Sequence, residues 1–266
     1  MSDTQNNQPS VNSVQDLFQN AQAAAGKSGI GPQTKEILVN NLTPVTAAGA
    51  QGVSSDALSS DRAQLIVTLL DMTSSMRPFR QDVIDAYNTM IDTLKSSRQA
   101  DQMLLSAWTF NTAPYLLHGY TPMEFVPSLN KTSYKPDDAT ALYDAILHGL
   151  IGAVAYGQDL RNQGVRTKIT YIVFTDGEDN VSRSTARQVH LVVTDLLAQE
   201  IYTFVLVGFG EEGLAQDIAR QIGFTNTLQA NADAASIKQA LNIVSRSLIR
   251  NSQTMHTSGA SNAFFS

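Results

Sequence analysis

The sequence predicts an α/β protein with a doubly wound, mostly parallel central sheet flanked by helices on both faces. From residue 64 onward, four apolar runs alternate with stretches of helical period. These runs are apolar at odd and even positions alike, which indicates strands buried on both faces. Helices on each side of a parallel sheet produce such burial. The four predicted strands cover residues 65–71, 103–110, 169–175 and 201–208.

The predicted helices follow from apolar residues that recur at spacings of three and four. The first begins near Pro78, whose fixed φ angle suits a first helical turn, and the second follows Thr140. The helical faces in chain order are Ile84, Tyr87, Ile91 and Leu94; Leu142, Ala145, Ile146, Gly149 and Ala153; Val189, Val192, Val193, Leu196 and Leu197; Leu214, Ile218 and Ile222; and Ile237, Leu241, Val244 and Leu248. Each stripe predicts a helix that packs on the sheet.

Two shorter strands complete the predicted sheet. Residues 115–118 follow a turn at 111–114 and form a short antiparallel edge strand, and residues 225–229 form the final strand. The predicted domain therefore covers residues 61–250.

Residues 1–60 are predicted to be a low-complexity, mobile tail. They are rich in Gln, Asn, Ser, Thr, Ala and Gly, and burial of so few large apolar groups does not offset the entropy of ordering. The alternative for residues 13–25 is a short amphipathic helix that docks, behind a Ser13 cap. Its apolar face would be Val14, Leu17, Phe18 and Ala21.

Residues 251–266 are predicted to be a C-terminal tail that is polar until Phe264-Phe265. These two aromatic residues either dock, on a partner or on the domain, or are incidental to a frayed terminus. We favour the second interpretation.

Composition narrows the class of protein. The chain has 266 residues, 42% of them hydrophobic, and a formal net charge of −6. A negative charge without a basic stripe argues against nucleic acid and against anionic membranes as partners. The sequence shows no secretory signal, no run of 18 apolar residues and no Cys, so we expect a cytoplasmic protein of a bacterium.

Oxygen-bearing side chains follow three predicted elements. Asp71, Thr73 and Ser75 come directly after the first strand, Thr140 stands at a helix entrance, and Asp176 follows the third strand. In a doubly wound sheet, loops at the carboxyl ends of neighbouring strands converge on one crevice. Carboxylates and hydroxyls suit Mg²⁺ or Mn²⁺, whereas Zn²⁺ usually recruits Cys and His, and this chain has no Cys and 4 scattered His.

These three motifs, in this order, resemble the metal-ion-dependent adhesion site (MIDAS) of the von Willebrand factor A (vWA) domain family. The resemblance covers residues 62–250 and implies a Rossmann-like vWA fold. It also implies that Asp71, Thr73, Ser75, Thr140 and Asp176 are the metal-site residues. The family more often has Ser where Thr73 stands, and Gly often precedes the Thr of the second motif, where this chain has Ala139.

The resemblance implies a non-catalytic, Mg²⁺-dependent protein–protein interaction module, with Mn²⁺ or Ca²⁺ as alternative ions. An Asp or Glu of the protein partner would displace a metal-bound water. Bacterial intracellular relatives often work beside AAA+ ATPases or within multiprotein assemblies, and such partners are implied here too.

Two other functions compete with this one. The first is a structural subunit that self-assembles through the metal face and tails, with Glu178 or Glu211 filling a neighbour's site. The second is a Mg²⁺-dependent phosphoryl-transfer hydrolase, which is disfavoured because Thr73 stands where such enzymes need a second Asp.

Near Asp176, we favour a solvated loop over a second carboxylate shell for residues 178–180.

Overall fold

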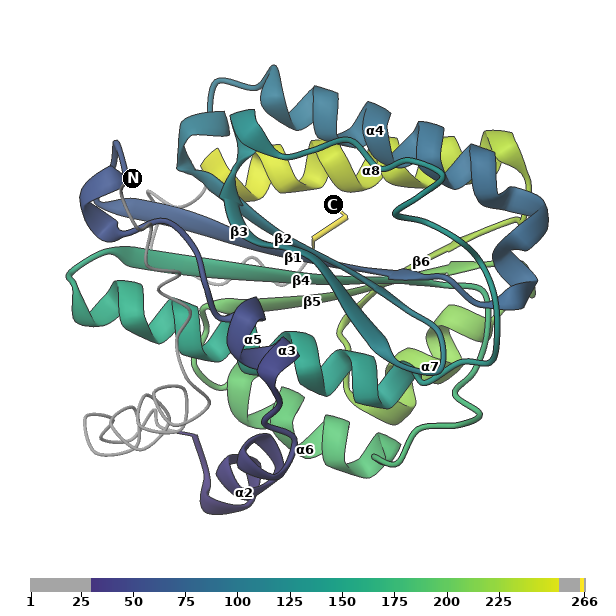
Figure 1. The fold of residues 1–266 in the computed structure, drawn as a ribbon, viewed down its shortest axis with the longest axis horizontal. Helices are drawn as coiled ribbons and strands as arrows, with labels where there is room; N and C mark the ends of the chain where they lie inside the picture. The colour runs from purple at the N-terminus through teal and green to yellow at the C-terminus, as the bar shows by residue number, and fades with distance from the viewer. Residues whose placement is uncertain (1–29, 254–263, 266) are drawn as a thin grey trace, which may run out of the picture.

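A computed structural model describes residues 30–253 and 264–265. It contains a six-stranded sheet in the order β3-β2-β1-β4-β5-β6, in which every neighbouring pair is parallel except β2 and β3. Figure 1 shows the sheet between two layers of helices. The strands are β1 (Arg62–Asp71), β2 (Met103–Phe110), β3 (Pro114–Pro122), β4 (Arg166–Thr175), β5 (Tyr202–Phe209) and β6 (Asn226–Ala230). The predicted doubly wound sheet with an antiparallel edge strand is confirmed.

The sheet separates two apolar cores, and alternate residues of one strand enter different cores. In β1, Leu65 packs in one core and Ile66 packs in the other. Successive side chains of a strand point to opposite faces, so a strand that supplies both cores is apolar at odd and even positions alike. This is why β1 does not alternate; its buried Thr68 hydroxyl lies 3.0 Å from the Tyr87 hydroxyl.

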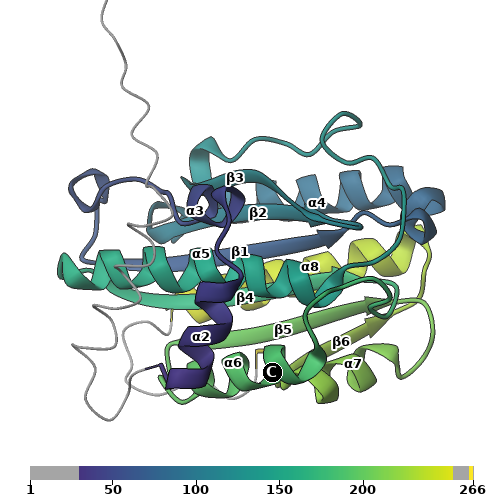
Figure 2. The same ribbon diagram turned by 60° about the horizontal axis from the view of Figure 1, so that its bottom comes forward.

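Helices cover both faces of this sheet. One face is covered by α4 (Arg80–Lys95) and α8 (Ala234–Gln253). The other is covered by α5 (Leu142–Asn162), α6 (Ala186–Leu197) and α7 (Leu214–Ile222), as Figures 1 and 2 show from two directions. The five predicted helices are all present.

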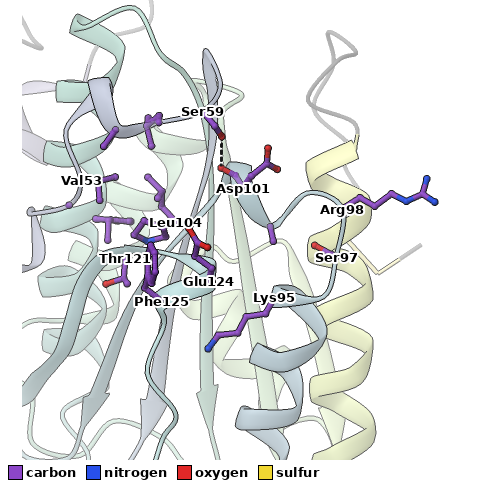
Figure 3. Close-up of a pocket in the computed structure, with 16 residues that line it drawn as sticks. Val53, Ser59, Lys95, Ser97, Arg98, Asp101, Leu104, Thr121, Glu124 and Phe125 are labelled. Atoms are coloured by element: carbon purple, nitrogen blue, oxygen red, sulfur yellow. Dashed lines mark hydrogen bonds between the residues drawn. The ribbon is translucent and has the colours of Figure 1, made fainter.

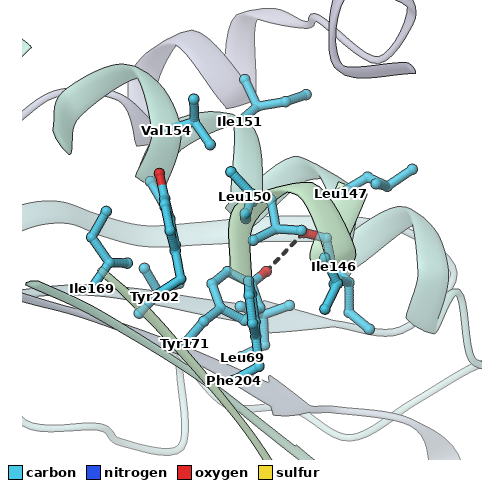
Figure 4. Packing of buried hydrophobic residues seen from close by; sticks show 14 of the residues in the cluster. Leu69, Ile146, Leu147, Leu150, Ile151, Val154, Ile169, Tyr171, Tyr202 and Phe204 are labelled. Atoms are coloured by element: carbon cyan, nitrogen blue, oxygen red, sulfur yellow. Dashed lines mark hydrogen bonds between the residues drawn. The ribbon is translucent and has the colours of Figure 1, made fainter. Parts of the chain in front are cut away.

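The packing of α5 on the sheet combines apolar burial with one buried hydrogen bond. The Tyr171 hydroxyl donates to the backbone carbonyl of Ile146 over 2.8 Å, at the centre of the cluster in Figure 4. A buried tyrosine hydroxyl without a partner would cost free energy, so this bond fixes the position of α5 over β4.

Pro78 does not open α4 as predicted. It lies inside a short 3₁₀ helix, η2 (Ser74–Phe79), and α4 begins two residues later. The tighter turn still places proline where its missing N–H is not needed by an α-helix.

Residues 30–60, which we call the N-terminal arm, differ from the predicted mobile tail. They form α2 (Pro32–Asn40), α3 (Pro44–Gly49) and the 3₁₀ helix η1 (Ser55–Ala57). Leu38 is fully buried, and the Asp195 carboxylate on α6 accepts hydrogen bonds from Gly31 N (3.0 Å) and Thr34 Oγ1 (2.6 Å). The arm is ordered because it covers apolar surface of α5 and α6; residues 1–29, with the proposed helix at 13–25, lie outside the described residues.

The C-terminal residues also differ from the prediction. Helix α8 continues to Gln253, and Phe264 is buried in the core beneath α4 and α8. Its backbone N–H donates to Asn226 Oδ1 over 2.9 Å. Phe264 is therefore part of the core rather than incidental, because α8 leaves apolar surface beside β6 that it fills.

Among the described residues, no helix combines the length and the apolar character needed to cross a membrane.

Candidate metal site

The strand register brings the first and third predicted motifs to the same edge of the sheet. Leu70 pairs with Phe174 in the parallel β1–β4 ladder, so Asp71 and Thr175 end neighbouring strands and Asp176 follows directly. On the other side of β1, Asp71 pairs with Phe110, the last residue of β2. Carboxyl ends of parallel strands meet at one edge, and the loops there share a crevice.

The first loop turns its polar groups back toward Asp71. The Asp71 carboxylate accepts the Thr73 N–H at Oδ1 over 2.9 Å and the Thr175 hydroxyl at Oδ2 over 2.6 Å. The short η2 turn then places the Ser75 hydroxyl 3.0 Å from the Thr73 hydroxyl. Alternate residues of this loop therefore point their oxygens to one side.

The chain of hydrogen bonds continues from the first loop into the third. The Ser75 hydroxyl donates to Asp176 Oδ1 over 2.9 Å. Hydrogen bonds thus link Asp71, Thr73, Ser75 and Asp176, first through the Thr73 N–H and then through the two hydroxyls, and the group runs from the buried Asp71 to the exposed Ser75. This arrangement is open to solvent only at its Ser75 and Asp176 end.

Hydrogen bonds to its backbone hold Thr140 against the loop that follows Asp176. Its N–H donates to Asn180 Oδ1 over 2.8 Å, and its carbonyl accepts the N–H groups of Asn180 (3.0 Å) and Val181 (3.2 Å). Thr140 is buried, but in the described structure its hydroxyl is not hydrogen-bonded to the other four predicted ligands. The structure therefore connects four of the five predicted residues and places the fifth through the loop of Asp176.

The second loop is also tied to the first. Ser74 N donates to the Asp138 carbonyl, and Asp137 N donates to the Met72 carbonyl, each over 3.0 Å. The residue with a positive φ angle is Asp138 (63°), not Ala139. Asp tolerates this left-handed conformation better than most residues, so the loop makes its turn one residue early and Ala139 needs no glycine-like backbone.

Burial sets the electrostatics of both carboxylates. Desolvation raises the pKa of Asp71 to about 6, against hydrogen bonds from Thr175 and Thr73 that lower it, and the charge of Asp176 raises it further. Desolvation likewise raises the pKa of Asp176, although the Ser75 hydroxyl opposes the change. Because both pKa values are raised, ionising these two neighbouring carboxylates costs free energy, and a positive charge nearby would lower that cost.

These residues fit a small, hard cation. They offer two carboxylates and three hydroxyls, which are the oxygen ligands of Mg²⁺ rather than the nitrogen and sulfur ligands of Zn²⁺. A cation beside Asp71 would remove the electrostatic cost of ionising it. In the part of the chain that the structure describes, no group of three or more His, Cys, Asp and Glu side chains is placed to hold a metal, so any ion here relies on the hydroxyls.

Residues 178–180 form a solvated loop, with Glu178 and Asn180 exposed and Asp179 half-buried, but the side chains of Asp179 and Asn180 also make hydrogen bonds. Besides the bonds from Asn180 to Thr140, Asp179 Oδ1 accepts the Tyr143 N–H at the first turn of α5 over 3.3 Å. Glu178 is exposed, as predicted. The sequence shows that these residues are polar, but their partners lie about 40 residues away and no spacing rule identifies them.

Asp144 forms a second set of hydrogen bonds between the first turn of α5 and the loop after β4, and the sequence did not predict it. Its carboxylate accepts the N–H groups of Ser184 (2.9 Å) and Arg183 (3.0 Å). The first turn of α5 and the loop after β4 therefore hold each other in place. Thr140 and Asp176 therefore lie on two segments of the chain that are hydrogen-bonded to each other.

The fold and the site together define a doubly wound α/β domain with hydrogen-bonded carboxylates and hydroxyls on the loops at the carboxyl edge of its sheet. No family model and no curated protein matches the sequence. Solved structures match the fold. The D319A mutant of the PilB minor pilin from Streptococcus sanguinis matches with a TM-score of 0.54 and 10% identity over 77% of this chain and 65% of the pilin.

Two further solved structures are similar. The pilus adhesin SpaC from Lactobacillus rhamnosus GG matches with a TM-score of 0.50 and 12% identity over 71% of this chain and 30% of the adhesin. A von Willebrand factor type A protein from Catenulispora acidiphila matches with a TM-score of 0.46 and 13% identity over 71% of this chain and 43% of that protein. At these identities the likeness to the pilin and to the adhesin establishes the fold alone, and this chain spans less than two thirds of the length of each of the three proteins.

Proposed function

We propose that this chain is a non-catalytic, Mg²⁺-dependent protein-binding module of the vWA type. Asp71, Thr73, Ser75, Thr140 and Asp176 would hold the ion. The observation that supports this proposal best is the series of hydrogen bonds from Asp71 to Asp176, through the Thr73 N–H and then the Thr73 and Ser75 hydroxyls, which links two loops at the carboxyl edge of the sheet. Loops that already share these bonds need little reorganisation to converge on one cation.

The exposure of each residue indicates how a partner would approach. Asp71 is 1% exposed, whereas Ser75 is exposed and Asp176 is half-buried, so the group faces solvent at its Ser75 and Asp176 end. When bound, a Mg²⁺ ion supplies a Lewis-acidic position for an additional oxygen ligand. A protruding Asp or Glu of a partner would approach from this end, because a carboxylate is a hard anionic ligand.

The hydroxyls support binding rather than catalysis. Ser75 donates to Asp176, and Thr175 donates to Asp71, so in these bonds each hydroxyl orients a carboxylate. A nucleophilic hydroxyl would instead donate to a general base such as His. We extend the proposal to a cytoplasmic bacterial protein whose partner belongs to an AAA+ ATPase complex or another multiprotein assembly.

Titration calorimetry tests the metal site. We expect one Mg²⁺ site in the wild-type chain and none in Asp71→Ala, with Mn²⁺ and Ca²⁺ competing for the same site. Glu178→Ala is the matched control, since Glu178 is an exposed acid on the same loop as Asp176, and it should bind Mg²⁺ as the wild type does. Circular dichroism confirms that each variant is folded. Equal Mg²⁺ binding by folded Asp71→Ala would overturn the site.

A phosphatase assay tests the non-catalytic assignment. We expect no Mg²⁺-dependent turnover of generic phosphate esters. Turnover that is present in the wild type and lost in Asp71→Asn would show a hydrolase instead.

A further inference from the structure

A second hollow lies at the opposite end of the sheet from the candidate metal site. It has a volume of about 790 Å³ and is formed at the amino ends of β1 and β2. β1 has ten residues, so roughly 30 Å of strand separate this hollow from Asp71. A ligand pocket of a few hundred cubic ångströms or more is large enough for several side chains.

The wall of this hollow is largely apolar and includes an unusually exposed aromatic ring. Phe125, in the 3₁₀ helix η4 (Met123–Phe125), is 68% exposed. Val53 and Leu58 of the N-terminal arm also line the hollow. Figure 3 shows Leu104 of β2 between Val53 and Phe125. An exposed aromatic ring beside an apolar hollow indicates a surface that another group covers.

Some polar side chains around the hollow already have hydrogen-bond partners, and others point away from it. Lys95 extends toward η4 and donates to the Val126 carbonyl over 2.8 Å, while Arg98 points away (Figure 3). The buried Ser97 hydroxyl has no hydrogen-bond partner among the described residues. Asp101 and Glu124 also line the hollow, which therefore suits an apolar occupant with polar and charged groups at its border.

The chain itself supplies a segment of this chemistry. Residues 13–22 carry Val14, Leu17, Phe18 and Ala21 at helical spacing, and the remaining positions are amides, Ser13 and a single charge, Asp16. The eight residues between Ala21 and Ile30 span at most about 30 Å, which is comparable to the length of β1. The arm that follows Ile30 already runs to the hollow and forms its wall.

We propose that residues 13–22 dock in the hollow between the N-terminal arm and η4, with Val14, Leu17, Phe18 and Ala21 against Phe125. An amphipathic helix in an apolar groove is a common mode of recognition. The side chains that this docking would bury are the four apolar ones that the sequence places on a single face of the segment. This docking is independent of the metal site, because the two lie at opposite ends of the sheet.

Engineered disulfides test the proposal in the full chain, which has no Cys of its own. Cysteine replaces Val14, Leu17, Phe18 or Ala21 in turn, each combined with Thr121→Cys at the rim of the hollow. A disulfide needs its two Cα atoms within about 7 Å. We expect at least one of these pairs to close on mild oxidation. An intramolecular bond means docking on the same chain and supports the proposal, whereas a dimer alone means docking on a neighbouring copy and would overturn it.

The matched control uses Tyr115→Cys with the same four partners. Tyr115 is an exposed aromatic on the same strand as Thr121, but it lies outside the hollow. Closure of the Thr121 pairs no faster than the Tyr115 pairs would overturn the proposal, as would no closure at all.

A second pair of variants separates docking from chance collision. Leu17→Asp with Phe18→Asp should slow disulfide closure about tenfold or more, because a charged face cannot enter the apolar hollow. Gln15→Asp with Gln19→Asp places the same charges on the polar face and should close as the parent does. Mg²⁺ binding should be the same in all of these variants. Equal slowing by both pairs would contradict docking through the apolar face.

Discussion

Asp71 is the more deeply buried of the two carboxylates in the candidate metal site, so its ionisation costs free energy. Its carboxylate is almost fully buried, and desolvation raises its pKa to about 6 despite hydrogen bonds from Thr175 and Thr73. An acid whose pKa is raised by folding stabilises the fold only while it is protonated. Between the unfolded value of 3.8 and about 6, stability should therefore fall as pH rises.

Asp71→Asn tests this cost directly. Asn keeps an oxygen for the Thr73 N–H and presents an amide to the Thr175 hydroxyl, which can accept as well as donate. The pKa shift corresponds to about 3 kcal/mol at most. In EDTA at pH 8, we therefore expect Asp71→Asn to be more stable than the wild type by about 1–3 kcal/mol, and near pH 4 we expect similar stabilities.

Urea denaturation at the two pH values measures the difference. Adding Mg²⁺ should stabilise the wild type and leave Asp71→Asn unchanged, because only the carboxylate offsets the charge of the ion. A variant that is less stable than the wild type in EDTA at pH 8 would show that ionised Asp71 is already compensated.

Asn180 positions Thr140 without being a predicted ligand. Its side chain and backbone both bond to the Thr140 backbone. Groups that orient metal ligands typically contribute about 10–100-fold to metal affinity. We expect Asn180→Ala to weaken Mg²⁺ binding by about tenfold or more, measured by calorimetry, while the neighbouring Glu178→Ala has no effect. Equal affinities in all three proteins would mean that Thr140 takes no part in the site.

At the scale of elements, the arm and α5 meet through glycines. A Cβ atom at Gly152 of α5 would lie 2.6 Å from the Gly49 carbonyl oxygen of α3. Real Cβ atoms do not approach backbone this closely, so the absence of a side chain allows the two helices to touch. The contact places α3 over Trp108, the largest fully buried side chain of the described residues.

Gly152→Ala should separate the two helices. Because the clash is with backbone, which cannot rotate away, we expect the free energy of unfolding to fall by about 1–3 kcal/mol. Gly157→Ala is the control on the same helix, since a Cβ there would meet the movable end of the Ile169 side chain at 2.9 Å. Thermal and urea unfolding compare the two. A Gly157→Ala variant that loses as much as Gly152→Ala would remove the role of the α3 contact.

At the scale of the whole molecule, the domain begins at the N-terminal arm rather than at the first strand. The arm buries Leu38 and Ala47 against the α5 face and is fastened to Asp195 on α6. An arm that covers core residues behaves as part of the cooperative unit.

Truncation distinguishes the arm from the residues before it. Deleting residues 1–60 should lower the free energy of unfolding by about 3 kcal/mol or more, because it removes buried apolar side chains and uncovers α5. Deleting residues 1–29 should preserve a cooperative transition and Mg²⁺ binding. If both truncated proteins unfold like the full chain, the arm is not part of the stable domain.

The sequence by itself determined the sheet, its flanking helices and the edge at which Asp71, Thr140 and Asp176 lie. These features follow from burial within one element, since a strand between two cores is mostly apolar at odd and even positions alike and a covering helix is apolar at every third or fourth. Chain direction in a parallel sheet then places the loops. Neither step requires knowledge of a distant residue.

Only the tertiary structure decided the contacts between segments far apart in the chain. The order of the arm depends on Gly49 meeting Gly152 and on Thr34 meeting Asp195, and the burial of Phe264 depends on the space beside β6. Small and polar residues of this kind leave no periodic signal, because their stabilisation comes from close approach and from single hydrogen bonds. The positioning of Thr140 by Asn180 has the same origin.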